Sequence, residues 1–198
     1  MAARLVLAST SRYRAELLAR LGLPFEVESP GTDEAIRAGE APRARALRLA
    51  HAKASAVAAR RSGRWIVGSD QVAVCADRIL EKPGDDERCR EQLAASSGRS
   101  VEFHTAVVLW RPDSSAASEH VDRTRVRFRQ LAPADIARYV ELDRPYDCAG
   151  GFRSEGLGVT LFESIETQDP SALVGLPLVW LAGALRAAGL DPLAPSQR

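Results

Sequence analysis

Strand-like and helix-like segments alternate along most of the chain, and this alternation constrains its fold more than any other feature. Apolar or alternating segments typical of strands begin at Leu5 and recur at 25–29, 64–75, 101–111 and 119–131. Amphipathic segments typical of helices lie between and after them, at 12–22, 42–61, 85–98, 132–142 and 177–190. Intermixed strands and helices form layered α/β domains. We therefore predict an α/β fold with a mixed sheet, as a single domain over 1–198.

Composition excludes several classes of protein. Hydrophobic residues make up 45% and charged residues 27% of the chain, as in soluble globular proteins, and the net charge is +1. This charge gives no reason to expect nucleic acid or a membrane surface as partner, and no apolar run is long enough to span a bilayer. The three cysteines are far apart and lack zinc spacing, which favours reduced thiols. We expect a cytoplasmic protein without nucleic-acid or membrane partners.

The turn after the first strand carries small hydroxyl side chains and leads directly into a helix. Ser9, Thr10 and Ser11 precede that helix, and Arg12 and Arg14 lie in its first turn. Amide groups and the positive end of the helix dipole make such a junction an anion site, where Arg14 would grip a phosphate. The alternative is that Ser9 or Ser11 only caps the helix and the arginines lie in solvent. This segment alone leaves both interpretations open.

The segment 64–75 is an apolar strand that contains the polar stretch 68–71, which predicts a bulge or a site at that point. A carboxylate inside an apolar strand, such as Asp70, is costly unless it binds a cation, a metal or a substrate. Asp70 is therefore the leading candidate for a functional carboxylate.

Three further charged residues are candidates only in combination. Glu34 lies in an acidic loop, Lys53 lies within the second helix, and Lys82 follows a hairpin after Asp70. Each of them alone is typical of solvated surface. Together, two carboxylates and several cations are what metal-assisted attack on a polyphosphate requires. The carboxylates would bind Mg²⁺ or Mn²⁺, and the cations would neutralise the charge of the phosphates. No Walker motif is present, which argues against a P-loop enzyme.

Two other features have a functional and a structural interpretation. Cys148 lies beside a glycine-rich loop and is a candidate nucleophile, although nothing in the sequence ties a histidine to it. The arginines of 123–129 alternate with apolar residues, which is typical of a solvated strand face, with an RNA-binding strip as the alternative.

The assembled motifs resemble those of the Maf family of nucleoside triphosphate pyrophosphatases. The resemblance rests on "LASTSRYRAELLARLGLPFEVESP", "TDE", "RLAHAKA", "VGSDQVAV", "EKPG", "SSGRSVEFHTAV", "YDCAGGFRSEGLG" and "DPSALVGLPL", which follow one another along nearly the whole chain. Within the family, "GSDQV" and "YDCAGGFRSEGLG" most resemble the 7-methyl-GTP pyrophosphatase group. Arg12 departs from the proline that often follows the serine of the opening motif.

The resemblance implies a fold and a set of roles. It implies two lobes around a mixed, strongly twisted sheet flanked by helices, with the site in the cleft. It implies that Asp70 is the general base and that Ser11 and Arg14 hold phosphate. It implies that Glu34, Lys53 and Lys82 serve the metal and the phosphates, with Glu34 and Asp70 as the metal carboxylates. It also implies a homodimer, as in many members of the family.

The resemblance further places Tyr13, Gln71 and Glu155 at the positions that choose the base. Guanine offers two adjacent donors that one carboxylate accepts, and N7-methylation adds a positive charge that Glu155 and the Tyr13 ring favour. The expected reaction is hydrolysis of 7-methyl-GTP to 7-methyl-GMP and pyrophosphate. The alternatives are a dTTP/UTP pyrophosphatase of the same family and a non-catalytic nucleotide-binding regulator of cell division.

Overall fold

A computed structural model of the protein describes residues 4–113 and 117–194. Its strands are β1 (Leu5–Ala8), β2 (Phe25–Glu28), β3 (Trp65–Cys75), β4 (Arg78–Leu80), β5 (Ser100–Trp110), β6 (Ser118–Phe128) and β7 (Phe162–Glu166). Its α-helices are α1 (Arg12–Ala19), α2 (Pro42–Ala58), α3 (Asp86–Ser96), α4 (Pro133–Asp143) and α5 (Leu178–Ala187). Two 3-10 helices complete the set, η1 (Leu157–Leu161) and η2 (Ala172–Val174).

The strands form a mixed sheet in the order β2-β1-β3-β5-β6-β7, with β4 paired to β3. The chain divides into two compact units. The first contains the residues up to Gln71, Thr105–Asp122 and the residues from Asp169 on, and the second contains Val72–His104 and Arg123–Gln168. Strands β3, β5 and β6 therefore contribute residues to both units. The predicted α/β class with a mixed sheet is confirmed.

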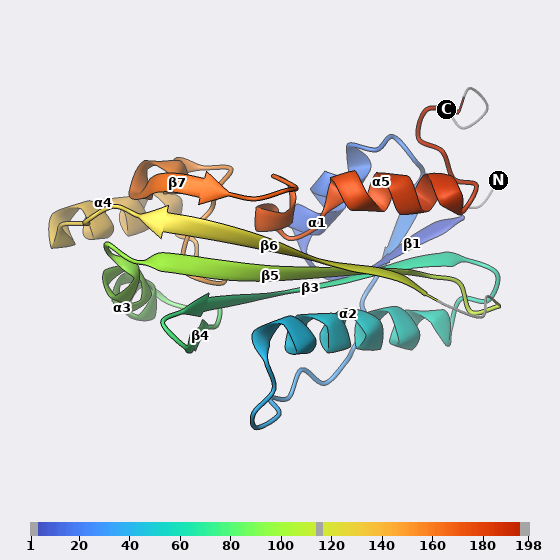
Figure 1. Cartoon of the computed structure of the whole chain (residues 1–198), viewed down its shortest axis with the longest axis horizontal. Coiled ribbons are helices and arrows are strands. Elements are labelled where there is room, and N and C mark those ends of the chain that lie inside the picture. Colours follow the sequence, from blue (N-terminus) through green and yellow to red (C-terminus); the bar gives the residue numbers. More distant parts are fainter. Residues whose placement is uncertain (1–3, 114–116, 195–198) are drawn as a thin grey trace. The chain divides into compact units, whose positions relative to one another are not determined.

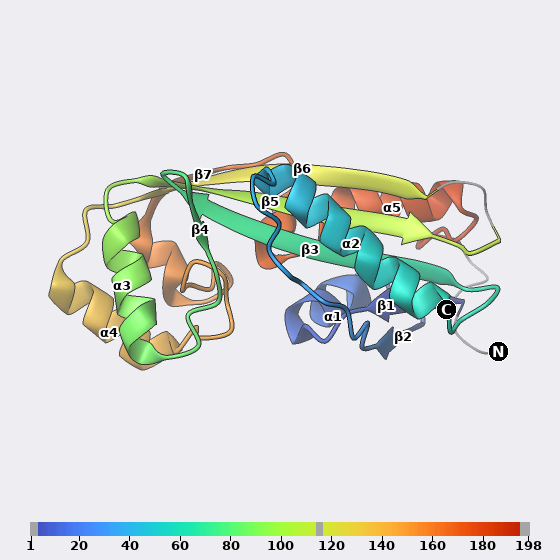
Figure 2. The ribbon, with the colours of Figure 1, turned by 90° about the horizontal axis from the view of Figure 1, so that it is seen from below.

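The first unit has helices on both faces of its strands. Strand β1 lies between β2 and β3 and is parallel to both. One face packs against α1 and α5 and forms the main core, which includes Leu5, Leu17, Val67, Val107 and Leu181. The opposite face is covered by α2, and Figures 1 and 2 show α2 and α5 on opposite sides of β3 and β5. Alternate residues of β3 therefore meet different helices.

Helix α2 lies unusually close to β3 because Gly68 has no side chain. A Cβ atom at Gly68 would lie 2.3 Å from the carbonyl oxygen of Ala50 and 2.9 Å from the nitrogen and Cβ of Ala54. Side chains that α2 directs toward the sheet are mostly small, and its alanines at 46, 50, 54 and 58 are buried. This close approach brings the next buried α2 side chain, that of Lys53, against the strand.

The second unit is built from hairpins, α3, α4 and a cluster of phenylalanines. Strands β3 and β4 form an antiparallel hairpin, and β6 and β7 are also antiparallel. The rings of Phe152 and Phe162 are 4.8 Å apart in an edge-to-face arrangement, and Phe103 and Phe128 contact the same cluster. These aromatic contacts form the core of the unit.

The sequence predicted most of these elements but missed one strand. Strand β3 runs without interruption through the polar stretch 68–71, because each polar side chain there finds a partner on one face or the other. Strand β7 was missed because it lies at the edge of the sheet and only its first residue is buried. The hairpin of β5 and β6 is present, although residues 114–116 of its predicted turn lie outside the described residues. In the described part of the chain, no helix is both long and apolar enough to cross a bilayer.

Candidate active site

The polar residues of the first unit meet where the carboxyl end of β1 lies beside the parallel strand β3. The chain leaves β1 through α1 to reach β2 on one side and returns through α2 to reach β3 on the other. The carboxyl end of β1 lies beside Gly68 of β3, because Ala8 pairs with Gly68, and β3 continues beyond this point to Cys75. In open α/β sheets, ligands bind at such a reversal of strand order. The hydroxyl-rich turn after β1 and the polar stretch 68–71 therefore share the position that binds ligands in such sheets.

Both serines of the turn are part of the cap of α1. The backbone N–H of Arg14 donates to Ser11 Oγ at 3.4 Å, and the N–H of Ser11 donates to Ser9 Oγ at 3.0 Å. The capping role is confirmed, and Arg12 is exposed as the alternative expected, whereas a solvent position for Arg14 is wrong. The half-buried Arg14 side chain donates from Nε to the carbonyl oxygen of Gly175 at 2.9 Å.

A buried lysine joins the two candidate carboxylates. Lys53 Nζ lies 2.5 Å from Asp70 Oδ1 and 2.8 Å from Glu34 Oε1. The side chains of Lys53 and Asp70 are only 8% and 9% exposed, whereas that of Glu34 is 54% exposed. Burying a charge is costly unless an opposite charge accompanies it, so the Lys53–Asp70 pair is mutually dependent. The interpretation of Lys53 as a solvated surface residue is therefore wrong.

Arg14 shares the electrostatic environment of this pair. Burial lowers the pKa of the Arg14 guanidinium, and the negative charges of Asp70 and Glu34 oppose that shift. The guanidinium remains charged, since its ordinary pKa is far above neutrality. Two cations and two carboxylates therefore lie in one region of the first unit, with one acidic group accessible to solvent.

The other face of β3 carries Ser69 and Gln71, which contact the segment before α5. Ser69 Oγ lies 2.7 Å from the carbonyl oxygen of Ala106 and 3.0 Å from that of Gly175. Gln71 Nε2 donates toward Thr105 Oγ1 at 2.9 Å and toward the backbone carbonyls of η2 at 3.0 and 3.1 Å. Sequence reasoning missed Gly175 and Thr105 as parts of this arrangement. Their only signal was membership of the motifs "DPSALVGLPL" and "SSGRSVEFHTAV".

The remaining base-selecting candidate of the first unit is Tyr13, beside the capping serine on α1. The Arg12 guanidinium carbon lies 4.7 Å from the centre of the Tyr13 ring, and Arg12 Nη2 donates to the Tyr13 hydroxyl at 2.7 Å. A cation over the ring face shows that this ring can contact a positively charged group.

Two predicted site residues belong to the second unit. Lys82 is exposed and lies between β4 and α3. Glu155 is also exposed and accepts a hydrogen bond from Ser154 Oγ at 3.3 Å. The roles of both residues, and the location of the site in a cleft, stay predictions.

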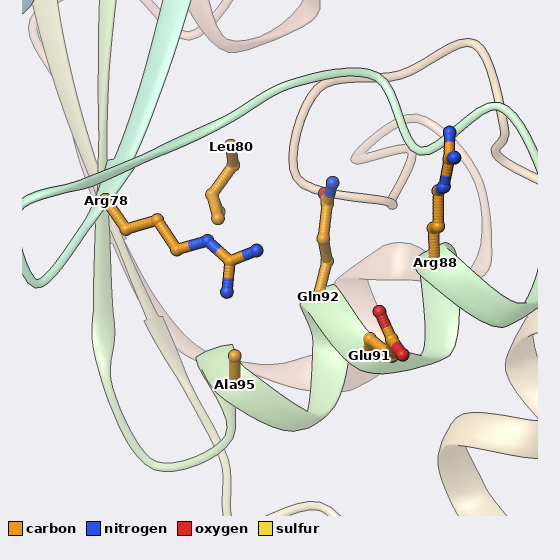
Figure 3. A pocket seen from close by; sticks show the side chains of 6 residues that line it. All are labelled: Arg78, Leu80, Arg88, Glu91, Gln92 and Ala95. Carbon is orange, nitrogen blue, oxygen red and sulfur yellow. The ribbon is translucent and has the colours of Figure 1, made fainter.

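The second unit also contains a pocket of about 190 Å³ between β4 and α3 (Figure 3). It is lined by Arg78, Leu80, Arg88, Glu91, Gln92 and Ala95. None of these is a predicted site residue, and both arginines are exposed. The pocket is therefore separate from the residues that the sequence singled out.

The alternative functions of the arginine-rich strand and of Cys148 gain no support. Three arginines of β6 form ion pairs with glutamates of the neighbouring strands, as expected of a solvated face: Arg123 with Glu102 of β5, Arg125 with Glu166 of β7, and Arg127 with Glu163 of β7. The Cys148 thiol lies 3.5 Å from a carboxylate oxygen of Asp147. A neighbouring negative charge disfavours the thiolate that a nucleophile needs.

Comparison with known proteins identifies the family. The family model described as "Maf-like protein" matches residues 4–188. A 7-methyl-GTP pyrophosphatase of Xanthomonas oryzae pv. oryzae is 52% identical over 96% of this chain and 98% of its own length. One of Bordetella avium is 50% identical over 96% of this chain and 95% of its own length. The solved structure of the Staphylococcus aureus Ham1 protein matches the fold with a TM-score of 0.53 at 14% identity, and covers 93% of this chain and 98% of that one. The chain belongs to the Maf family.

Proposed function

We propose that the protein hydrolyses 7-methyl-GTP to 7-methyl-GMP and pyrophosphate. The observation that carries the proposal is the buried Lys53–Asp70 pair, which lies with Arg14 and the capped start of α1 where ligands bind in such sheets. The substrate is supported by relatives at 50–52% identity over nearly their whole length, which are named 7-methyl-GTP pyrophosphatases. A nucleoside triphosphate is an anion that such a cluster of cations can bind.

In the proposed reaction, Asp70 accepts a proton from the water molecule that attacks the α-phosphorus. A bond forms between the water oxygen and phosphorus, and the bond from phosphorus to the oxygen that bridges to the β-phosphate breaks. The leaving pyrophosphate keeps the electron pair of that bond. The proton transfer requires an ionised carboxylate, and the Lys53 ammonium group lies 2.5 Å from Asp70 Oδ1. Arg14 and Lys53 then stabilise the negative charge on the phosphates.

We also propose that the reaction requires Mg²⁺ or Mn²⁺. Within the described residues, no group of three or more His, Cys, Asp or Glu side chains is placed to hold a metal. A metal bound to nucleotide phosphates needs only one or two protein carboxylates, so Glu34 and Asp70 fit this requirement. Such a metal would supply charge stabilisation at the phosphates. Lys82 is the fourth proposed phosphate ligand, with Ser11, Arg14 and Lys53.

We propose that Tyr13, Gln71 and Glu155 select the nucleobase of the substrate. The Glu155 carboxylate is exposed, and its two oxygens would be able to accept two hydrogen bonds from a guanine edge. Gln71 is held through its Nε2, so in this arrangement its Oε1 is the atom that offers an additional hydrogen bond. The Tyr13 ring would stack on the methylated purine.

A panel of triphosphates tests the proposal. The purified protein is incubated with Mg²⁺ or Mn²⁺ and with 7-methyl-GTP, GTP, UTP or dTTP, and the products are separated by ion-exchange chromatography. We expect 7-methyl-GMP and pyrophosphate, with kcat/KM highest for 7-methyl-GTP and turnover lost when a chelator removes the metal. Equal efficiency with UTP or dTTP would assign the protein to the alternative pyrophosphatase activity. No pyrophosphate from any nucleotide would favour the non-catalytic nucleotide-binding regulator.

We further propose a cytoplasmic location and a homodimeric state. Cys75, Cys89 and Cys148 are free thiols, and burial raises the pKa of Cys89 to about 12. Such thiols are typical of a reducing compartment. Light scattering coupled to size-exclusion chromatography measures the oligomeric state, and a mass of one chain of 21.4 kDa would exclude the dimer.

A further inference from the structure

The proposed mechanism leaves the segment before α5 without a role, although this segment is tied together by several hydrogen bonds. The backbone N–H of Ser171 donates to Asp169 Oδ1 at 3.0 Å, and that of Val179 donates to Asp169 Oδ2 at 2.7 Å. Ser171 Oγ accepts from the N–H of Leu178 at 2.8 Å and lies 2.9 Å from the carbonyl oxygen of Leu176. Asp169 itself is buried. These bonds fix the backbone between the two ends of the segment.

Gly175 lies within this fixed segment, and its backbone carbonyl faces two side chains of the site region. Arg14 Nε donates to it at 2.9 Å, and Ser69 Oγ lies 3.0 Å from it. The φ angle of Gly175 is 124°, a conformation that residues with a side chain rarely adopt. The glycine therefore allows this carbonyl to take its position beside Arg14.

The single bond to Nε has a specific consequence for Arg14. A guanidinium group has five N–H donors in one plane, one on Nε and four on the terminal nitrogens. Among the described residues, the side chain of Arg14 has one hydrogen-bond acceptor, the Gly175 carbonyl oxygen, and this acceptor binds Nε. Fixing Nε fixes the plane of the group and leaves the terminal nitrogens for a two-point contact with one phosphate.

We propose that Ser69 and Gly175 are positioning residues, which orient Arg14 for the triphosphate and touch no substrate themselves. This inference rests on the proposed function, because it takes a polyphosphate as the anion. Ser69 is fully buried and lies one residue before Asp70, so the same strand directs the proposed base to one face and the support of Arg14 to the other.

A double-mutant cycle distinguishes this role from a purely structural one. Ser69→Ala removes the hydroxyl, and Arg14→Lys keeps the charge but removes the planar fork. We expect Ser69→Ala to raise the KM for 7-methyl-GTP by about tenfold with kcat nearly unchanged, as for loss of binding that ground state and transition state share. In the Arg14→Lys background, Ser69→Ala should have no further effect, because the guanidinium group that Ser69 helps to orient is already absent. Independent, multiplicative effects of the two substitutions would overturn the proposal.

The matched control is Ser96→Ala, which removes another fully buried serine hydroxyl bound to a backbone carbonyl, that of Gln92 on α3. It should leave KM and kcat unchanged. If Ser69→Ala does not fold, Ser69→Cys replaces it in the cycle, since a thiol is a weaker donor of similar size.

Calorimetric titration with pyrophosphate separates failure of this inference from failure of the proposed function. Pyrophosphate binding depends on the phosphate contacts and not on turnover. A wild-type protein that binds pyrophosphate but hydrolyses no triphosphate would refute the proposed function. The role of Ser69 would still be tested, because the dissociation constant of pyrophosphate can be measured for Ser69→Ala, Arg14→Lys and the double variant. If the wild-type protein does not bind pyrophosphate and hydrolyses no triphosphate, both proposals are wrong.

Discussion

Gly68→Ala tests whether the close contact between β3 and α2 supports both stability and the site. The added methyl group would lie 2.3 Å from the Ala50 carbonyl oxygen and 2.9 Å from two atoms of Ala54. Two of these three atoms belong to the backbone of α2 and the third is the Cβ atom of Ala54, so no side-chain rotation relieves the contacts. The helix has to move away from the strand by about 1 Å to restore ordinary contact distances. Overpacking of this kind costs about 1–3 kcal/mol of unfolding free energy.

The same displacement affects the site because Lys53 lies on the helix face that meets Gly68. Moving α2 lengthens the 2.5 Å contact between Lys53 Nζ and Asp70 Oδ1. A misplacement of about 1 Å in a catalytic arrangement can lower turnover by about a hundredfold. We therefore expect Gly68→Ala to lose both stability and kcat.

Urea unfolding and initial rates of pyrophosphate release measure the two effects. The matched control is Gly183→Ala on α5, where an added Cβ atom would meet nothing within 4 Å. That substitution should be neutral or stabilise the helix by about 0.5–1 kcal/mol, with kcat unchanged. A Gly68→Ala protein as stable and as active as the wild type would refute the reasoning about the strand–helix contact.

Four further outcomes are expected. Asp70→Asn should abolish turnover and also lower the melting temperature, because it leaves the buried Lys53 ammonium beside a neutral amide, and activity within about tenfold of wild type would contradict the role of Asp70 as base. Replacing the pair by Lys53→Met with Asp70→Leu should leave urea stability equal to wild type or raise it by about 1–4 kcal/mol, while Lys53→Met alone should lower it by about 3–5 kcal/mol. The hydrogen bond from Arg123 lowers the pKa of Glu102 to about 2. The stabilisation that the ionised Glu102 provides is therefore present above pH about 4.3 and is lost as the pH falls toward 2. In a plot of the urea midpoint against pH, Glu102→Gln should reduce the slope between these two pH values. Glu155→Gln should lower kcat/KM for 7-methyl-GTP and admit UTP, and an unchanged preference between the two nucleotides would remove Glu155 from base selection.

The sequence predicted the elements whose signals are local. The apolar periodicity of α1, the proline at the start of α2 and the alternation along β5 and β6 each depend on neighbours within one segment. Strand β7 was not recognised because an edge strand with one buried residue lacks a strong pattern of its own. Its pairing with β6 is a tertiary property, which no window of the sequence reveals.

The candidate site shows the same division. Asp70 was identified because a charge within an apolar strand is locally anomalous. The burial of Lys53 was not, since a lysine among helical alanines is compatible with either surface or core until the facing strand is known. The role of Gly175 was equally hidden, because its carbonyl meets a side chain 161 positions away in the sequence. Chemistry that depends on distant partners becomes visible only when the strands and helices are assembled.

The Lys53–Asp70 pair is better explained by chemistry than by stability. Two charges below a tenth exposed lose much of their hydration, and an apolar pair of similar volume is often as stable or more so. A fold selected for stability alone has no need of this arrangement beneath the close-packed alanines of α2. The third member of the group, Glu34, lies on a loop, and its side chain is 54% exposed. A buried carboxylate held next to a cation, with a second carboxylate accessible to solvent beside them, is the arrangement that the proposed attack on a polyphosphate by an activated water molecule would use.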